Sequence, residues 1–245
     1  MSGLLLVSCL DVGRFFGRDP LRASVGDVSD RISELYLRRS GGGFNHNVVI
    51  SSAQNVFSGA ITAEEGIAIC STNGNPKGRV QNTAIAKAVL PYAEANLSRC
   101  HRIGFTAIVV GRYRGKSIYV GVKAPFVRVN GENSLIVLPG FRKSSRPLGR
   151  EIDLACSFAA NQLARDDYET ADIEYLMAGP GSGQFERVLQ VLHGREMNLF
   201  SSEELDSILR TYVSAVVRHL DRGEGLRPAH LYGYRIIDPS APRFV

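Results

Sequence analysis

Four short apolar runs between residues 105 and 138 constrain the fold more than any other feature of the chain. They comprise residues 105–110, 117–123, 126–129 and 134–138. The first run is apolar on both faces, as in a central strand, and the second alternates apolar with polar residues, as in a strand with one buried face. Asn130-Gly131 joins the last two runs, and Asn-Gly between apolar runs is the strongest short signal for a β-hairpin. These runs predict an antiparallel β-meander.

Apolar residues at helical spacing lie on both sides of the predicted meander. Helices are predicted over residues 27–39, 80–97, 148–165, 185–192 and 201–220, and short strands over residues 4–10, 48–50, 66–71 and 171–178. Pro91 predicts a kink or two shorter helices in the second helix, and Ser201 with Glu204 predicts a capping box at the last. The pattern predicts an α+β fold, with a central, mainly antiparallel β-meander flanked by helices and a helical C-terminal layer. We expect a single globular domain over residues 1–245, with a soft boundary near residue 147.

The charge is divided unevenly along the chain. Residues 99–150 hold eleven Lys or Arg and one acid, whereas residues 151–245 hold nine Arg, no Lys and fifteen acids. Residues 1–98 are nearly neutral, and the whole chain carries +5. Such asymmetry indicates a polyanionic partner. The alternative is that the basic part packs against the acidic part of the same chain.

The basic charge gathers at one turn of the predicted meander and just after its last strand. These residues are Arg112, Tyr113, Arg114 and Lys116 in the turn, and Arg142, Lys143 and Arg146 after the strand. Lys and Arg neutralise phosphates, and an aromatic ring can stack on an unpaired base. We therefore expect these residues to contact the backbone of a nucleic acid, DNA or RNA, without catalysis. A solvated basic face is the alternative interpretation.

The order of the predicted elements, from helix 80–97 through the meander and helix 148–165 to strand 171–178, resembles the core topology of restriction-endonuclease-like nucleases. Those enzymes place an Asp and a Glu-x-Lys on neighbouring strands, where the carboxylates hold Mg²⁺ against a phosphate. The equivalent strand here reads Val-Gly-Val-Lys123, with the lysine present and the acid missing. The resemblance therefore implies a related topology and argues against an active nuclease of that type.

A small-molecule or phosphoryl enzyme is the second hypothesis. Gly179-Pro-Gly-Ser-Gly183 lies between a predicted strand and a predicted helix, so Gly181, Ser182 and Gly183 could cradle a phosphate at the helix N-terminus. Asp172 and Glu174 are two residues apart on a predicted strand, so both carboxylates face one side and could share a metal. Asp153 and Asp166–Asp167 are further acids that could approach them. A tight turn and a solvent-facing edge strand explain the same residues without a ligand.

The four cysteines, Cys9, Cys70, Cys100 and Cys156, show no metal-site or disulfide spacing. They predict reduced thiols in a cytoplasmic protein, and Cys70 is a candidate nucleophile because it ends a predicted strand. An inert buried cysteine is the alternative for Cys70. No run approaches the roughly 18 to 20 apolar residues that span a bilayer, so no membrane span is expected.

A third hypothesis is an assembly subunit in which basic and acidic surfaces of neighbouring chains pair, which would make a homo-oligomer. Whether the protein is an enzyme, and which cofactor it uses, stays open from the sequence alone.

Overall fold

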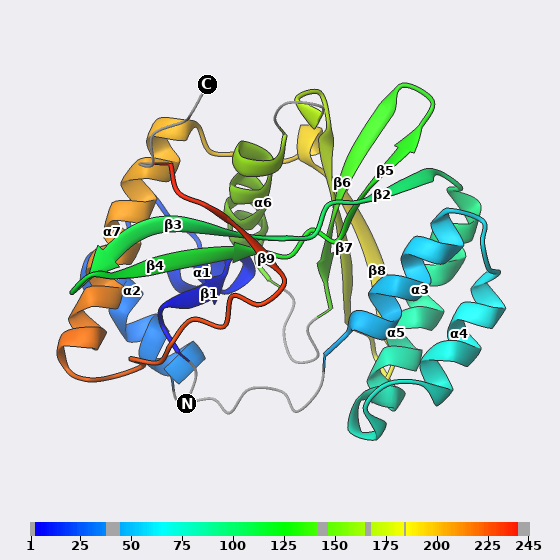
Figure 1. The fold of residues 1–245 in the computed structure, drawn as a ribbon, viewed down its shortest axis with the longest axis horizontal. Coiled ribbons are helices and arrows are strands. Elements are labelled where there is room, and N and C mark those ends of the chain that lie inside the picture. The colour runs from blue at the N-terminus through cyan, green and yellow to red at the C-terminus, as the bar shows by residue number, and fades with distance from the viewer. Residues whose placement is uncertain (1–2, 38–44, 142–146, 165–167, 184, 240–245) are drawn as a thin grey trace.

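A computed structural model describes residues 3–37, 45–141, 147–164, 168–183 and 185–239. In these residues the chain adopts an α+β fold with two mixed β-sheets, as the sequence predicts. Figure 1 shows one sheet at each side of helix α6, and a group of three helices covering the far face of the second sheet.

The first sheet, which we call sheet A, has the strand order β1-β4-β3-β9. Its strands are β1 (Leu6–Ser8), β3 (Phe105–Tyr113), β4 (Lys116–Val122) and β9 (Tyr234–Ile237). The hairpin β3–β4 is antiparallel, and β1 and β9 pair in parallel with β4 and β3 respectively. Sheet A thus combines both ends of the described chain with its middle.

The second sheet, sheet B, has the strand order β2-β5-β6-β7-β8. Its strands are β2 (Arg99–Arg102), β5 (Phe126–Asn130), β6 (Asn133–Gly140), β7 (Asp172–Pro180) and β8 (Arg187–His193). Strands β6 and β7 are parallel and the other pairs are antiparallel. The predicted hairpin at Asn130-Gly131 is confirmed, and Gly131 has the positive φ of 62° that such a turn requires.

The prediction of one continuous meander over residues 105–138 is wrong. The hairpin β3–β4 belongs to sheet A and the hairpin β5–β6 to sheet B. Strand β4 pairs with β1 on one side and β3 on the other, so it has no edge left for β5. A sequence pattern shows which residues are in strands but not which edges are occupied by distant segments.

The helices pack as two groups. Helices α3 (Asn47–Phe57), α4 (Ala63–Thr72) and α5 (Pro76–Ala95) cover one face of sheet B, and α6 (Gly149–Leu163) covers the other (Figure 1). Helices α1 (Cys9–Phe16), α2 (Val25–Ile32) and α7 (Ser202–Asp221) form, with α6, the second group, which packs around the first core on the inner side of sheet A. Two hydrophobic cores result, one on each face of sheet B. Alternate residues of one strand enter different cores: Ile136 faces the first and Val137 the second.

Three predicted elements have the wrong type. Residues 48–50 and 66–71 lie in helices α3 and α4, and residues 185–192 lie mostly in strand β8. The Val-Val-Ile run at 48–50 has strand propensity, but its helix buries Val49, Ala53 and Val56, which are spaced for a helical face. Tertiary packing decides these short segments over local propensity.

Other elements follow their predictions. Ser201 and Glu204 form the expected capping box of α7. Helix α5 is one helix that contains Pro91, so the alternative of two shorter helices is wrong. Among the described residues, no helix combines the length and the apolar character needed to cross a bilayer.

Candidate nucleic-acid interface

The basic turn of residues 112–116 connects β3 to β4. Arg114 and Gly115 both have positive φ, 46° and 78°, as in a type I′ hairpin turn. The ring of Tyr113 is buried in the first core, with 6% of the residue exposed, and its hydroxyl donates to Asp221 Oδ1 at 3.0 Å. Tyr113 therefore does not present a ring for stacking on a base.

The arginines of this turn pair with acids of the C-terminal third. Arg112 lies 3.1 Å from Asp238, and Arg114 lies 3.6 Å from Asp221. Both arginine side chains remain largely exposed, at 62% and 76%, so each pair contributes little to stability. The acidic and basic parts of the chain thus meet within one molecule at this turn. Lys116 is exposed, and Arg142, Lys143 and Arg146 lie outside the described residues.

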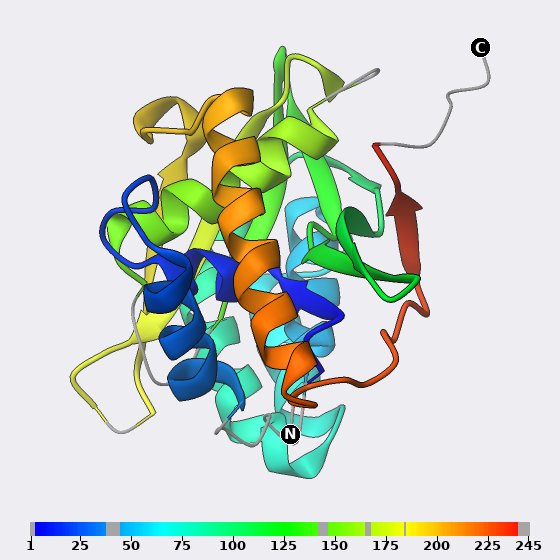
Figure 2. The ribbon, with the colours of Figure 1, turned by 90° about the vertical axis from the view of Figure 1, so that its left-hand side faces the viewer.

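A second surface, the outer face of sheet A, lies beside this turn. Ile108, Ile118, Val120 and Val122 point into the first core, so the residues between them point to the opposite face. Helices α2, α6 and α7 lie on the core side of β3 and β4, and no helix of the described chain covers the other side (Figure 2). We define the outer face as the following residues, all at least partly exposed: Leu6, Phe105, Val109, Arg112, Tyr119, Lys123, Tyr234 and Ile236.

Two aromatic rings and a lysine form a row on the outer face. The ring centroids of Phe105 and Tyr234 are 5.6 Å apart, and Lys123 Nζ lies 5.7 Å from the Phe105 centroid. Tyr234 lies over Gly121, where a Cβ would be 3.3 Å from Tyr234 Cε1. The absence of a side chain at Gly121 therefore lets the tyrosine ring approach the sheet. Burial, followed by the nearby Cys9, raises the pKa of Tyr234 to about 12, so its hydroxyl is neutral at physiological pH.

The charge around this row is positive. None of the outer-face residues is acidic, and Asp238, which follows β9, is held by Arg112. Arg102 is exposed on β2, the strand that precedes β3 in the chain, whereas Arg235 is exposed on β9 but faces away from Tyr234 and Ile236. Phe105 and Lys123 lie in predicted strands. No local pattern predicts that Tyr234 joins them, because its strand pairs with residues about 130 positions earlier in the chain.

The glycine-rich turn connects two strands, β7 and β8, and not a strand to a helix. The expected helix N-terminus is therefore absent at residues 181–183. The donors of the turn are bonded to Glu186 Oε2, which accepts from Ser182 N at 2.9 Å, Ser182 Oγ at 2.7 Å and Gly183 N at 2.9 Å. A carboxylate of the same chain thus takes the place predicted for a phosphate.

Asp172 and Glu174 both have partners. Asp172 Oδ1 accepts from the backbone amides of Ile173 and Arg195, while both carboxylate oxygens of Glu174 bond to Arg128. Among the described residues, no group of three or more His, Cys, Asp or Glu side chains could hold a metal ion. Asp166 and Asp167 lie outside the described residues. Lys123, compared above with the nuclease lysine, lies beside Phe105 at the end of sheet A.

The nucleophile candidates are enclosed. Cys70 lies within helix α4 and not at a strand end, it is fully buried, and burial raises the pKa of its thiol. The sequence analysis did not identify a second group of possible catalytic side chains, Ser29, His219 and Glu224. Ser29 Oγ lies 3.0 Å from His219 Nε2, and His219 Nδ1 bonds to Glu224. Ser29 is 3% exposed and its backbone carbonyl also bonds to His219 Nε2. The histidine therefore ties α2, α7 and the following loop together and does not present Ser29 to a substrate.

No protein-family model matches the chain, and no curated protein is significantly similar to it.

Proposed function

We propose that the protein binds single-stranded nucleic acid on the outer face of sheet A, without catalysing a reaction. The observation that carries this proposal is the row of Lys123, Phe105 and Tyr234 on a sheet face that no helix of the described residues covers. The proposal keeps the class expected from the charge distribution. It moves the centre of binding from the turn at residues 112–116 to the neighbouring sheet face.

The physical argument rests on stacking combined with phosphate neutralisation. Unpaired bases stack on aromatic rings with about 1–3 kcal/mol per base, whatever the base. Lys123 adjoins the first ring, and Arg112, whose side chain is 62% exposed beside Asp238, lies on the same face of the sheet. A single strand can lay its bases on the rings and its phosphates on these cations, whereas the bases of a duplex are already paired and stacked.

A cytoplasmic setting belongs to the same proposal. All four cysteines are free thiols, and Cys9, Cys70 and Cys156 are buried. Free buried thiols are compatible with a reducing compartment, where nucleic-acid partners are present.

The test is fluorescence anisotropy with labelled oligonucleotides of about 20 nucleotides, a length that exceeds the site of a single small domain. We expect the single strand, as oligo-dT or oligo-U, to bind more tightly than a duplex of equal length, with affinity that falls as salt rises. Tyr234→Ala should weaken single-strand binding by about tenfold, because one stacking ring is lost. Lys123→Gln should make the slope of log affinity against log salt shallower by about 0.7.

The matched control is Lys77→Gln, which makes the same charge change at an exposed position at the start of α5. It should leave both affinity and slope unchanged, and circular dichroism should show that all variants fold. Absence of binding at low salt, or equal losses in Lys77→Gln and Lys123→Gln, would rule out the outer face as the site.

A further inference from the structure

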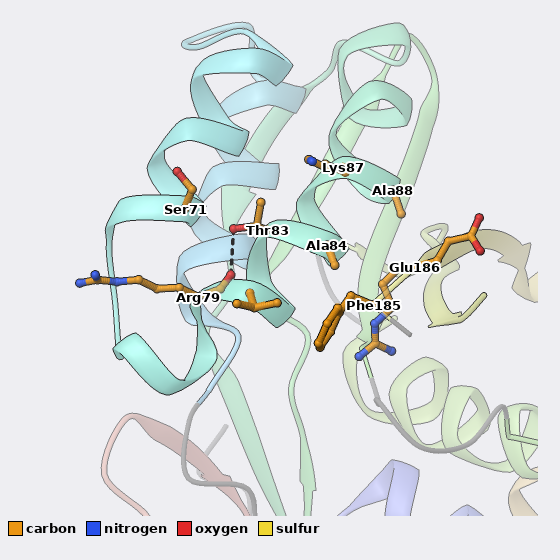
Figure 3. A pocket seen from close by; sticks show the side chains of 10 residues that line it. Ser71, Arg79, Thr83, Ala84, Lys87, Ala88, Phe185 and Glu186 are labelled. Carbon is orange, nitrogen blue, oxygen red and sulfur yellow. Dashed lines mark hydrogen bonds between the residues drawn. The ribbon is translucent and has the colours of Figure 1, made fainter. Parts of the chain in front are cut away.

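A groove lies on the opposite side of the molecule from sheet A, between α5 and the strand β8. Its volume is about 580 Å³. It is lined by Ser71, Arg79, Val80, Thr83, Ala84, Lys87, Ala88, Phe185, Glu186 and Arg187 (Figure 3). Pockets of about 300–1,000 Å³ typically hold small organic ligands.

One wall of the groove is apolar and open to solvent. Val80, Ala84 and Ala88 are spaced four residues apart, so they form a ridge along the outside of α5. Phe185 faces this ridge from the other side of the groove (Figure 3). Val80 is 56% exposed and Phe185 is 46% exposed, so a flat apolar group could enter between them and bury both.

The charged groups of the groove are arranged for an anion. Arg187 is 8% exposed, and its guanidinium donates to Gln81 Oε1 at 2.7 Å and to the Ala178 carbonyl at 3.3 Å. These bonds hold the arginine in place next to Phe185. Burial lowers the pKa of Arg187 from its ordinary value. Lys87 adds an exposed ammonium one turn along α5 from Ala84.

The acid of the groove is directed elsewhere. Glu186 is the one carboxylate among the lining residues, and its Oε2 is bonded by Ser182 and Gly183. Figure 3 shows its carboxylate turned away from Phe185. Arg79 also extends away from the ring, and its carbonyl accepts from Thr83 Oγ1 at 2.8 Å. Lys87 therefore presents the exposed positive charge that a ligand next to Phe185 would meet, and the enclosed guanidinium of Arg187 adds positive potential behind it.

We propose that this groove binds a small organic anion with an aromatic ring system, whose ring lies between Phe185 and the Val80–Ala88 ridge and whose acid group meets Lys87. The choice of occupant follows from charge complementarity and from the size of the groove. This site is separate from the proposed nucleic-acid surface and does not depend on it.

Two fluorescent probes with the same rings test the proposal on the full chain. One is 8-anilinonaphthalene-1-sulfonate, and the other is N-phenyl-1-naphthylamine, which lacks the sulfonate. We expect the sulfonate to bind at one saturable site about tenfold more tightly than the neutral probe, because only the sulfonate can pair with Lys87. Lys87→Gln should weaken the sulfonate about threefold or more and leave the neutral probe unchanged, whereas Phe185→Ala should weaken both.

Lys77→Gln lies on the same helix outside the groove and should change neither affinity. A saturating single-stranded oligonucleotide should not displace the sulfonate, so this result stands apart from the test of the sheet surface. Equal affinities for the two probes, or a sulfonate affinity that Lys87→Gln leaves unchanged, would overturn the proposal.

Discussion

At the residue scale, the buried side chain of Glu174 on β7 is held by three hydrogen bonds. Arg128 donates to both of its carboxylate oxygens, from Nε at 2.7 Å and Nη2 at 2.6 Å, and the hydroxyl of Tyr92 donates to Oε1 at 2.6 Å. The Arg128 guanidinium also lies 5.1 Å from the centroid of the Phe57 ring. Arg128 and Glu174 are 4% and 0% exposed, so loss of either would leave an uncompensated buried charge. The group joins α3 and α5 to β5 and β7.

Glu174 also shows why side-chain partners could not be predicted from the sequence. Asp172 and Glu174 are correctly placed on a strand, and from their spacing alone they resemble a metal site. The arginine that neutralises Glu174 is 46 positions earlier in the chain, on a strand that is not adjacent to β7. Side-chain partners across a sheet depend on strand order, which no local pattern contains.

Tyr212 on α7 carries the first residue-scale prediction. It is fully buried, and its hydroxyl has no hydrogen-bond partner within the described part of the chain. Burial raises the pKa of this tyrosine well above its ordinary value, so the group stays a neutral, unsatisfied hydroxyl. Tyr212→Phe removes that hydroxyl without changing the ring. We expect the free energy of unfolding to rise by about 1 kcal/mol, measured by urea denaturation.

Tyr92→Phe makes the same chemical change where the hydroxyl does have a partner, the carboxylate of Glu174. It should lower the free energy of unfolding by about 2 kcal/mol, because the bond is to a charged acceptor. If Tyr212→Phe also lowered the free energy of unfolding, the Tyr212 hydroxyl would have to be hydrogen-bonded in the folded protein.

At the element scale, some helices and strands can be predicted from the local sequence and others cannot. The strands β4, β5 and β6 and the helix α7 follow from alternation, the Asn130-Gly131 turn and the Ser201 capping box. Strand β8 does not, because Val188, Leu189 and Leu192 also fit a helical face. The strand forms because β7 offers it an open edge, and its residues then alternate between the two cores.

The β7–β8 hairpin supports a prediction about Glu186. Hydrogen bonds from Ser182 and Gly183 lower the pKa of its carboxyl group. A carboxylate with a lowered folded-state pKa stabilises the turn at and above its ordinary pKa, and that contribution is lost as pH falls through the lowered value. We expect the amide signal of Gly183 in NMR spectra to move upon acidification below about pH 4.3, the ordinary glutamate pKa, and to be insensitive to pH above neutrality.

Glu186→Ala should free the same three donors for an external anion. Inorganic phosphate should then shift the Gly183 signal in the variant and not in the wild-type protein, because the wild-type donors already have a carboxylate acceptor. Glu196→Ala removes an exposed charge nearby in the chain and serves as the matched control. A phosphate-induced shift of equal size in the wild-type protein would show that the turn binds phosphate as it stands.

At the scale of the whole molecule, sheet B joins segments from both sides of residue 147. Strands β2, β5 and β6 precede it, β7 and β8 follow it, and β6 pairs directly with β7. Each face of this sheet belongs to a different hydrophobic core. If the helices of one core separated from sheet B, one face of its strands would be exposed to water while the other face stayed packed. Exposing apolar residues such as Val137 and Leu176 in this way would be unfavourable. This arrangement supports the expectation of a single domain, which stays a prediction.

That expectation has a direct test, because the chain contains no tryptophan. Tyr36→Trp places a fluorescent reporter beside the first core, and Ile67→Trp places one on α4 beside the second, both at partly exposed positions. In each variant we expect the urea midpoint from tryptophan fluorescence to coincide with the midpoint from far-ultraviolet circular dichroism. The comparison is made within each variant, so any destabilisation by the new side chain affects both signals equally. If the helices α3 to α5 form an independent unit, they will unfold while the first core stays folded. The Ile67→Trp fluorescence midpoint will then separate from the circular dichroism midpoint of the same variant, which would contradict the prediction.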